Sequence, residues 1–322
     1  MSRRLAVAAV AAVAVLWAGS AWAQAYPNRP VRIIAPFPAG GLADVLARAV
    51  GEEMTKSLGQ PVVVENRAGA GGNVGAELVA NSPPDGYTLM LASAGILSAN
   101  EFLYAKMAFD PATAFAPITL VADMPVLLVV HPKTGVSNVR EFVARVKAEP
   151  GKLNFGSPGN GTTGHLCQAG FVHAATVQIT HIPYRGAAPA VQDLLGGQID
   201  GLFENPPIIM EHIKAGSIRA LGVASKQRLA VLPDLPTMTE AGSPYECSSW
   251  FGLVAPAKTP PEIISRLNRD AVAGLNTPAT QQRFVTSGAR LVGNTPQEFQ
   301  AFIASERARW GNMIRAAGIK LD

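Results

Sequence analysis

The chain has 322 residues and a formal net charge of +4, and charged residues make up 16% of it. Its basic residues are mixed with acidic ones instead of being gathered into a stripe, so we expect no nucleic-acid partner. The length is sufficient for two medium-sized domains, each with its own core.

Residues 1–23 have the composition of a cleaved secretory signal peptide. Arg3 and Arg4 are followed by the apolar run Leu5–Ala18, and Ala21-Trp22-Ala23 offers a cleavage site before Gln24. A transmembrane anchor is the alternative, but the apolar run is short for a bilayer span. We therefore expect an exported protein that is soluble after cleavage.

The first part of the predicted fold passes from a buried strand at 31–35, through a glycine turn, into an amphipathic helix. Gly40 and Gly41 stand at this junction, where unpaired N–H groups of the helix can accept an anion. Asp44, in the first helical turn, can cap that helix, with Arg48 as its partner, or hold a water or a ligand ammonium group. Both roles for Asp44 stay open.

Strands and helices then alternate, which predicts a largely parallel α/β sheet. A second buried strand is expected at 61–66, a helix at 74–80 capped by Asn73, and a third strand at 87–93. Because ligands bind beyond the carboxyl ends of such strands, Ser93 joins Gly40 and Gly41 as a candidate ligand-binding residue.

A long apolar passage, 115–131, predicts a strand that leaves one lobe and enters another, and 250–255 predicts the strand that returns. Lobe 1 is thus expected to comprise 24–123 and 250–322, and lobe 2 to comprise 124–249. Ser137 is the predicted cap of a helix that extends to about residue 148. Capping boxes are predicted at 259–262 and 295–298. Two lobes joined by two crossing strands describe a cleft protein with a hinge.

The glycine turn recurs in the second lobe, where strand 152–155 leads into 156–164 and a helix that begins near Thr163. Backbone N–H groups and the hydroxyls of Ser157, Thr162 and Thr163 suit a carboxylate, which accepts several hydrogen bonds. An ordinary glycine-rich turn is the alternative. Two such turns at equivalent places in two lobes favour a binding site.

Signals for enzymatic catalysis are weak. The five histidines form no metal-binding or protease motif, and the segment around Ser157 is not a nucleophile elbow, because Pro158 would remove an oxyanion donor. Cys167 and Cys247 match no metal motif. Whether they form a disulfide is left open by the sequence. We expect neither a catalytic site nor a bound metal or cofactor.

Two charged residues follow strands of the second lobe. Arg185 can pair a ligand carboxylate or lie in solvent at the lobe edge, and Glu204 can face the cleft or lie in an exposed loop. The predicted ligand-binding residues are Phe37, Ala39, Gly40, Gly41, Asp44, Ser93, Ser157, Gly159, Asn160, Thr162, Thr163, Tyr184, Arg185, Gly186 and Glu204.

Several motifs, in the same order, resemble the Bug family, the extracytoplasmic solute-binding proteins of tripartite tricarboxylate transporters. They cover nearly the whole mature chain: Pro36–Arg48, Val64–Gly72, Pro84–Leu89, Phe155–Gly161, His165–Leu166, Pro183–Ala190, Asp193–Asp200 and Trp250–Leu253. Two positions depart from the family pattern, which more often has Lys at position 185 and Asp near position 204.

The resemblance implies a type II-like, two-lobed periplasmic-binding-protein fold that closes on a small carboxylate. It also implies a periplasmic location in a Gram-negative bacterium, a monomer, and delivery of the ligand to membrane transporter subunits. In the family the two glycine turns hold the ligand through backbone amides, hydroxyls and waters. Tricarboxylates, dicarboxylates, amino acids and aromatic acids all remain candidate ligands. The rival functions are a ligand-sensing module of a signalling receptor and a periplasmic enzyme acting on carboxylates.

Overall fold

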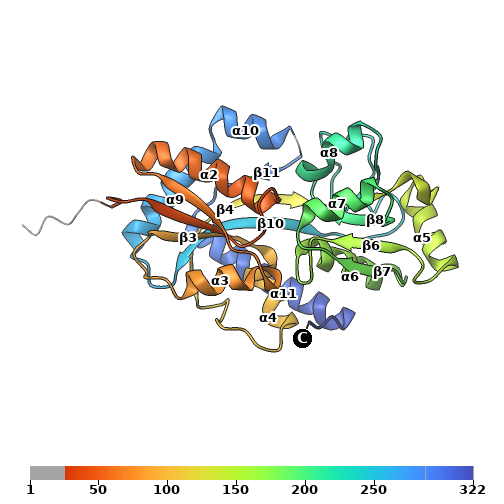
Figure 1. Cartoon of the computed structure of the whole chain (residues 1–322), viewed down its shortest axis with the longest axis horizontal. Coiled ribbons are helices and arrows are strands. Elements are labelled where there is room, and N and C mark those ends of the chain that lie inside the picture. The colour runs from red at the N-terminus through yellow and green to blue at the C-terminus, as the bar shows by residue number, and fades with distance from the viewer. Residues whose placement is uncertain (1–25, 287, 322) are drawn as a thin grey trace, which may run out of the picture.

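The computed structural model describes residues 26–286 and 288–321, so the predicted signal peptide lies outside the described residues. The described chain forms two α/β lobes arranged along the long axis of the molecule (Figure 1). Within this part of the chain, no helix combines the length and apolar character that a bilayer span requires.

Six strands form the sheet of the first lobe, in the order β11-β4-β10-β3-β1-β2. The inner strands β1 and β3 pair in parallel, as does β1 with β2, whereas β10 runs antiparallel to both β3 and β4. The strand bounds are β1 Val31–Ala35, β2 Val62–Asn66, β3 Thr88–Ser93, β4 Phe115–Pro125, β10 Ser248–Pro256 and β11 Arg290–Leu291. The predicted parallel α/β sheet is therefore extended by an antiparallel part.

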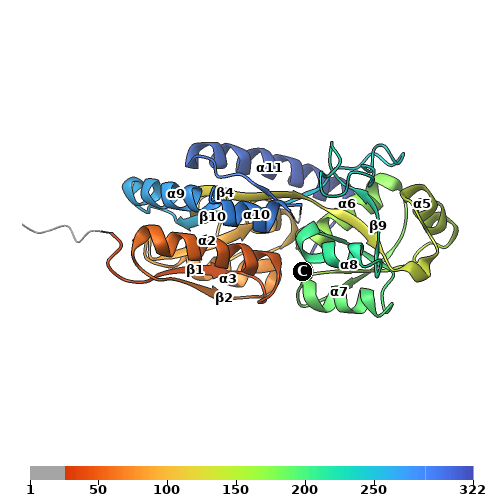
Figure 2. The ribbon, with the colours of Figure 1, turned by 90° about the horizontal axis from the view of Figure 1, so that it is seen from above.

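Helices cover both faces of this sheet (Figure 2). On one face, α2 (Leu42–Leu58) and α9 (Pro261–Leu275) bury a core that includes Leu46, Met54 and Leu267. On the other, α3 (Asn73–Ala80), the short helix η2 (Gly95–Ala99) and α11 (Pro296–Ala317) pack around Trp250 and Phe299. The lobe is completed by η1 (Ala70–Gly72), α4 (Asn100–Leu103) and α10 (Pro278–Val285).

The second lobe has a five-stranded sheet in the order β7-β6-β8-β5-β9. Its strands are β5 Leu127–Val130, β6 Asn154–Ser157, β7 Thr180–Pro183, β8 Gly201–Glu204 and β9 Arg219–Val223. Its helices are η3 Pro132–Thr134, α5 Val139–Ala148, α6 Thr163–Ala175, α7 Ala187–Leu195 and α8 Pro206–Lys214. The core around Phe142, Phe155 and Phe171 lies on one face, and the core around Leu194 and Ile209 lies on the other.

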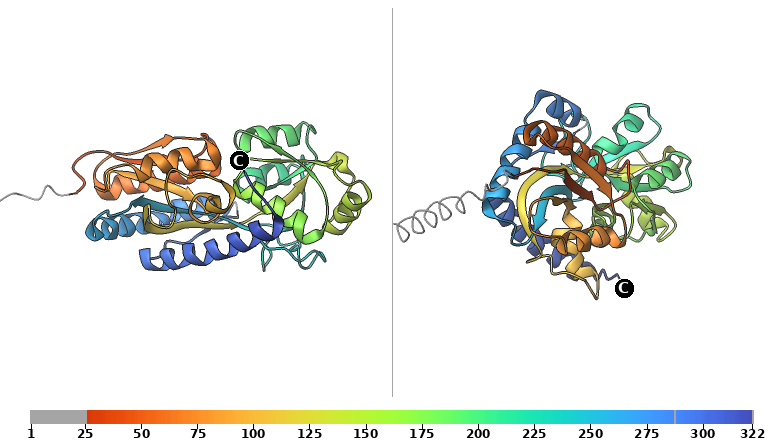
Figure 3. Two further views of the ribbon diagram at one scale, coloured as in Figure 1. Left: turned by 90° about the horizontal axis from the view of Figure 1, so that it is seen from below. Right: turned by 60° about the vertical axis from the view of Figure 1, so that its left-hand side comes forward.

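The chain crosses between the two sheets where β4 is followed directly by β5, and again at the start of β10. The predicted lobe boundaries, 123/124 and 249/250, lie within β4 and β10, close to these crossings. The last helix departs from a simple division, because α11 extends along both lobes (Figure 3) and places Trp310 and Ile314 in the core of the second. The long C-terminal helix therefore packs against both lobes.

Three helix caps differ from the predictions. Asn138 caps α5 in place of Ser137, and Gly72 occupies the cap position of α3 in place of Asn73. Thr259 donates to the carbonyl of Pro256 and caps no helix. Asn138 has the extended backbone typical of a cap, whereas Gly72 is left-handed with φ +97°, and Pro260 takes the cap position of α9. The second predicted capping box is confirmed, since Thr295 and Glu298 bond reciprocally at the start of α11.

The strand predicted at 61–66 forms as β2, but it is not buried. It is the edge strand of its sheet, and the Val63 side chain is exposed. An apolar run does not distinguish an edge strand from a central one, because both favour β-branched residues.

Cys167 and Cys247 form a disulfide, with their Cα atoms 5.7 Å apart. The bond joins α6 to the residue that precedes the returning strand β10. Tyr245 adds a hydrogen bond from its hydroxyl to the Cys167 carbonyl, at 2.7 Å. The question that the sequence left open is thus answered by a cross-link inside the second lobe.

Candidate functional site

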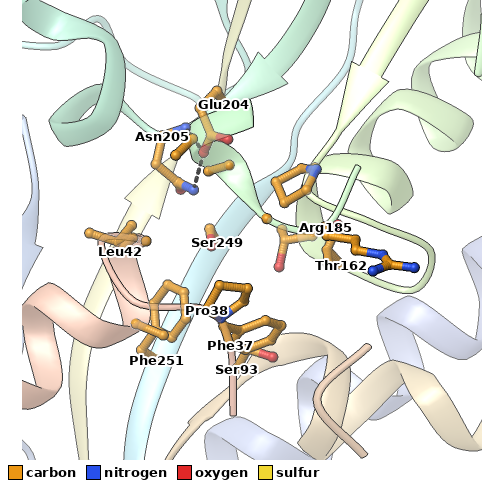
Figure 4. A pocket seen from close by; sticks show the side chains of 18 of the residues that line it. Phe37, Pro38, Leu42, Ser93, Thr162, Arg185, Glu204, Asn205, Ser249 and Phe251 are labelled. Carbon is orange, nitrogen blue, oxygen red and sulfur yellow. Dashed lines mark hydrogen bonds between the residues drawn. The ribbon is translucent and has the colours of Figure 1, made fainter. Parts of the chain in front are cut away.

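A cavity of about 110 Å³ lies between the two lobes, and four helices begin at its wall. We call it the inner cavity (Figure 4). The first residues of α2, α6 and α7 contribute to the lining, as does Asn205, the residue at the cap position of α8. The positive ends of four helix dipoles therefore converge on one small space, which favours a negatively charged ligand. The lining comprises Phe37, Pro38, Ala39, Gly41, Leu42, Ala43, Ser93, Pro158, Thr162, Thr163, Gly164, Arg185, Gly186, Ala187, Ala188, Pro189, Glu204, Asn205, Ser249 and Phe251.

Helices α2 and α6 each supply free donors. The backbone N–H groups of Leu42 and Ala43 in α2, and of Thr163 and Gly164 in α6, donate to no other residue in the described part of the chain. Their positions in the first helical turn leave them without an intrahelical acceptor. These four N–H groups border a cavity, so a ligand oxygen can take the bonds that the helices leave unmade.

Gly40 and Asp44 shape the turn before α2 rather than the cavity itself. Gly40 has φ +80°, a conformation that favours glycine, and its N–H donates to Asp44 Oδ2 at 3.0 Å. Oδ1 of Asp44 accepts from Asn66 and pairs with Arg48 at 2.9 Å. Burial opposes ionisation of Asp44, but the bonds from Arg48, Gly40 and Asn66 together lower its pKa. Asp44 is buried and does not line the inner cavity, so its local role is the one that the geometry supports.

Ser157 is also directed away from the inner cavity. Its buried hydroxyl lies 2.7 Å from His181 Nε2 and accepts from the N–H of Gly159. His165 stacks on His181, with ring centroids 4.3 Å apart, and its Nδ1 accepts from the N–H of Gly161. Burial lowers the pKa of both histidines to about 4, so both are neutral near pH 7. This group fixes the shape of the loop that precedes α6.

Three residues that line the inner cavity have hydroxyl groups without a hydrogen-bond partner among the described residues: Ser93, Thr163 and Ser249. They come from β3, α6 and β10. Thr162 differs, since its hydroxyl donates to the Gly159 carbonyl at 2.7 Å. A hydroxyl both donates and accepts, so the three free ones can bind a carboxylate directly or through water.

Arg185 and Glu204 carry the charge among the described residues that line the cavity. The Arg185 side chain is exposed, and its guanidinium points away from the middle of the cavity (Figure 4). Glu204 and Asn205 lie at the opposite side from Phe37 and Pro38. Glu204 is 2% exposed, and its Oε1 accepts from the backbone N–H and the side chain of Asn205, at 2.7 and 2.9 Å.

A wider groove of about 750 Å³ lies beside the inner cavity and shares Phe37, Thr162 and Gly186 with it. Of the other predicted residues, Gly159, Asn160 and Tyr184 line this outer groove. The Tyr184 hydroxyl donates to Asp193 Oδ2 at 2.7 Å. Burial and this carboxylate raise the pKa of Tyr184 to about 12, so the phenol stays neutral. The predicted residues thus divide between two connected spaces, apart from Gly40, Asp44 and Ser157, which line neither.

Several cavity-lining residues were missed in the sequence. Ser249 lies inside a strand that reads as core, and Asn205 follows Glu204 without any motif. No helix was predicted at 206–214, and Ala187, Ala188 and Pro189 at the start of α7 were not among the predicted ligand-binding residues. The rule that ligands bind beyond the carboxyl ends of parallel strands could have indicated these helix starts. Both β7 and β8 run parallel to β6 and end at the cleft.

The described residues contain no group of three or more His, Cys, Asp and Glu side chains placed to hold a metal ion. The chemistry that the site offers is hydrogen bonding from backbone N–H groups and hydroxyls, in the field of the helix termini.

Comparison with known proteins assigns the chain to a family. Residues 46–319 match the family described as tripartite tricarboxylate transporter family receptor. The chain is 40% identical to protein BugT of Bordetella pertussis, over 100% of this chain and 99% of that protein. It is 37% identical to the solved R. palustris Rpa4515 with adipate, covering 92% of this chain and 100% of that one, with a TM-score of 0.88. Against the periplasmic binding protein BugD it shows 38% identity, the same coverage and a TM-score of 0.87.

These likenesses confirm the predicted two-lobed α/β binding-protein fold, and the family is one of solute-binding receptors rather than enzymes. With a family match over most of its length and a full-length relative at 40% identity, the chain belongs to the tripartite tricarboxylate transporter receptor family, which includes the Bug proteins.

Proposed function

We propose that this protein captures a small organic carboxylate in the inner cavity and delivers it to the membrane subunits of a tripartite tricarboxylate transporter. The observation that supports this most directly is the convergence of four helix starts on one cavity, with unpaired N–H groups from α2 and α6 on opposite lobes. An anion bound there contacts both lobes at once, so it stabilises the arrangement in which they are together.

The proposed ligand-binding set combines the N–H groups of Leu42, Ala43, Thr163 and Gly164 with the hydroxyls of Ser93, Thr163 and Ser249. The carboxylate is thus held by neutral donors and helix dipoles, with the Arg185 guanidinium directed away from the middle of the cavity. We place the protein in the periplasm, exported by the signal peptide predicted at 1–23, and take 24–123 with 250–322 and 124–249 as its lobes.

A thermal-shift screen tests the proposal. Citrate, malate, adipate, glutamate and benzoate are added to the mature protein, and hits are measured by calorimetry. A ligand that binds only the folded state raises the unfolding temperature. At a concentration of a hundred times Kd it adds about 3 kcal/mol to the free energy of unfolding. The Gly41→Val variant is the matched loss-of-site protein, since Gly41 lines the cavity and has φ −79°, which valine can adopt. Equal affinity in Gly41→Val and wild type would contradict the placement of the site.

A further inference from the structure

One side of the inner cavity presents hydrogen-bond acceptors instead of donors. Helix α8 begins there with Pro206 and Pro207, which have no N–H groups, and the N–H of Asn205 is already bonded to Glu204. The start of α8 therefore lacks the free donors that α2 and α6 offer. What remains on this side is a carboxyl group and an amide oxygen.

Both of these groups are incompletely bonded. Glu204 Oε2 and Asn205 Oδ1 are buried and have no hydrogen-bond partner among the described residues. Glu204 is 2% exposed and Asn205 is 8% exposed, and both line the inner cavity (Figure 4). Buried acceptors without partners are costly, and a buried carboxylate is more costly still. Two such acceptors side by side at a binding cavity indicate that a bound ligand supplies the missing donor.

The charge of Glu204 narrows the identity of that donor. Arg185 is the cation of the cavity lining, and its guanidinium points away from Glu204 (Figure 4). None of the ion pairs among the described residues includes Glu204. Burial raises the pKa of Glu204 to about 7, as expected for a carboxyl group that has lost water without gaining a cation. A ligand ammonium group would supply both the N–H donors and the missing positive charge.

We propose that the ligand is a carboxylate that also carries an ammonium group, and that Glu204 Oε2 and Asn205 Oδ1 accept hydrogen bonds from this ammonium group. This inference rests on the proposed function. The carboxylate end lies against the starts of α2 and α6, where donors are free. The second carboxylate of a dicarboxylate would instead face two oxygens, which repel it. Glu204 and Asn205 therefore favour an ammonium over a second carboxylate at this end of the ligand.

Matched ligands that differ in one end group test this directly. In the first series, β-alanine, butanoate and succinate, two methylene groups separate the carboxylate from the end group. In the second series, 4-aminobutanoate, pentanoate and glutarate, three methylene groups separate them. In each series an ammonium, a methyl or a carboxylate stands at the same place. Calorimetry at about pH 8, where Glu204 is ionised, should give the amino compound at least about tenfold tighter binding than the methyl compound, and the dicarboxylate the weakest binding.

The Glu204→Gln variant keeps the shape and removes the charge. It should weaken binding of the amino compound by about tenfold or more and change binding of the methyl compound by less than about twofold. Glu211→Gln is the matched control, because this glutamate lies in α8, pairs with Lys214 and is highly exposed. It should leave all affinities unchanged. If Glu204→Gln does not fold, the order of the three end groups in the wild-type protein decides the question.

Tighter binding of the dicarboxylate than of the amino compound in wild type, unchanged in Glu204→Gln, would overturn this inference and leave the proposed function standing. Equal binding of all three end groups would have the same consequence. Failure of every carboxylate in both series and in the wider screen would overturn the proposed function, and this inference with it.

Discussion

Pro38 and Gly186 face each other across the two lobes at the edge of the inner cavity. A Cβ atom placed on Gly186 would lie 3.2 Å from Cγ of Pro38, and Gly186 has φ +118°. The turn before α2 in one lobe thus packs against the start of α7 in the other, and a glycine is needed for the approach. Pro38 and Gly186 line both the inner cavity and the outer groove, so this approach between the lobes lies where the two spaces meet.

A second glycine sets the distance between the lobes and gives the first prediction. A Cβ atom on Gly95 would lie 2.8 Å from the carbonyl oxygen of Gly161, which belongs to the other lobe. Gly95→Ala should therefore oppose the closed arrangement, at a cost of about 1–3 kcal/mol, and weaken binding of any carboxylate ligand by about tenfold. Calorimetry with the best ligand of the screen measures the change.

Gly196→Ala is the control for this effect. Its added Cβ would lie 3.5 Å from the nearest atom, the carbonyl oxygen of Gln192 within the same lobe, so it should leave affinity unaltered. Because Gly95 belongs to a short helix, alanine suits its backbone, and the unfolding temperature of ligand-free Gly95→Ala should stay close to that of wild type. Wild-type affinity in Gly95→Ala would show that the two loops separate in the bound state.

The hydroxyl of Thr163 gives the second prediction. Thr163 lines the inner cavity at the first position of α6, and valine has nearly the same shape without the hydroxyl. Thr163→Val should weaken carboxylate binding by about five- to tenfold, the value of one hydrogen bond of about 1 kcal/mol. Thr180→Val is the matched control, because Thr180 is exposed and lies at the start of β7, the end away from the cleft. This variant should bind the ligand as wild type does. A smaller effect at Thr163 than at Thr180 would remove this hydroxyl from the site.

The parts of the site that could be predicted from the sequence are those with a local signal. A strand followed by Gly40 and Gly41, and another followed by 156–164, mark helix starts whose N–H groups are free whatever surrounds them. The first crossing strand was predictable too, because the apolar passage 115–131 is longer than a strand that stays within the sheet of one lobe. Of the two roles left open for Asp44, the bonds observed are those within its own turn and with Arg48.

The remaining features depend on contacts between distant segments. Ser157 has the hydroxyl of a ligand residue, but His181, 24 residues later, takes it. Ser249 enters the cavity because β10 lies between β3 and β4, a pairing that no local pattern specifies. Glu204 was left between cleft and solvent, because burial of a strand end is decided by the lobe opposite. Two adjacent candidate caps, such as Ser137 and Asn138, can be distinguished only by their backbone conformation.

The disulfide between Cys167 and Cys247 gives the third prediction. It closes a separation of 80 residues in the second lobe, so its reduction should destabilise the protein by about 2–4 kcal/mol by enlarging the unfolded ensemble. The unfolding temperature of the mature protein is measured with and without dithiothreitol. The double variant Cys167→Ala/Cys247→Ala should unfold at a low temperature that dithiothreitol no longer changes. A wild-type unfolding temperature insensitive to reductant would contradict a stabilising bond.

The last prediction concerns the pH dependence of stability at Glu204. Burial raises the pKa of this carboxyl group from 4.5 to about 7 in the folded protein. Between these values the folded state keeps a proton that the unfolded state has released, so the stability contributed by Glu204 decreases as the pH rises through this range. The loss should reach about 3 kcal/mol above pH 7, because the carboxylate is then buried without a cation.

Glu204→Gln removes this titration and isolates it from that of other groups. His165 and His181, whose pKa values burial lowers to about 4, lose their protons on folding in the same pH range and act with the opposite sign, but they are present in both proteins. Urea unfolding of the ligand-free proteins from pH 4.5 to 8 should therefore show the variant gaining on wild type up to about pH 7 and then staying level, while Glu211→Gln follows wild type throughout. Parallel curves for Glu204→Gln and wild type would mean that Glu204 already has a cation or water in the empty cavity, since only a carboxylate without either is destabilised on ionisation.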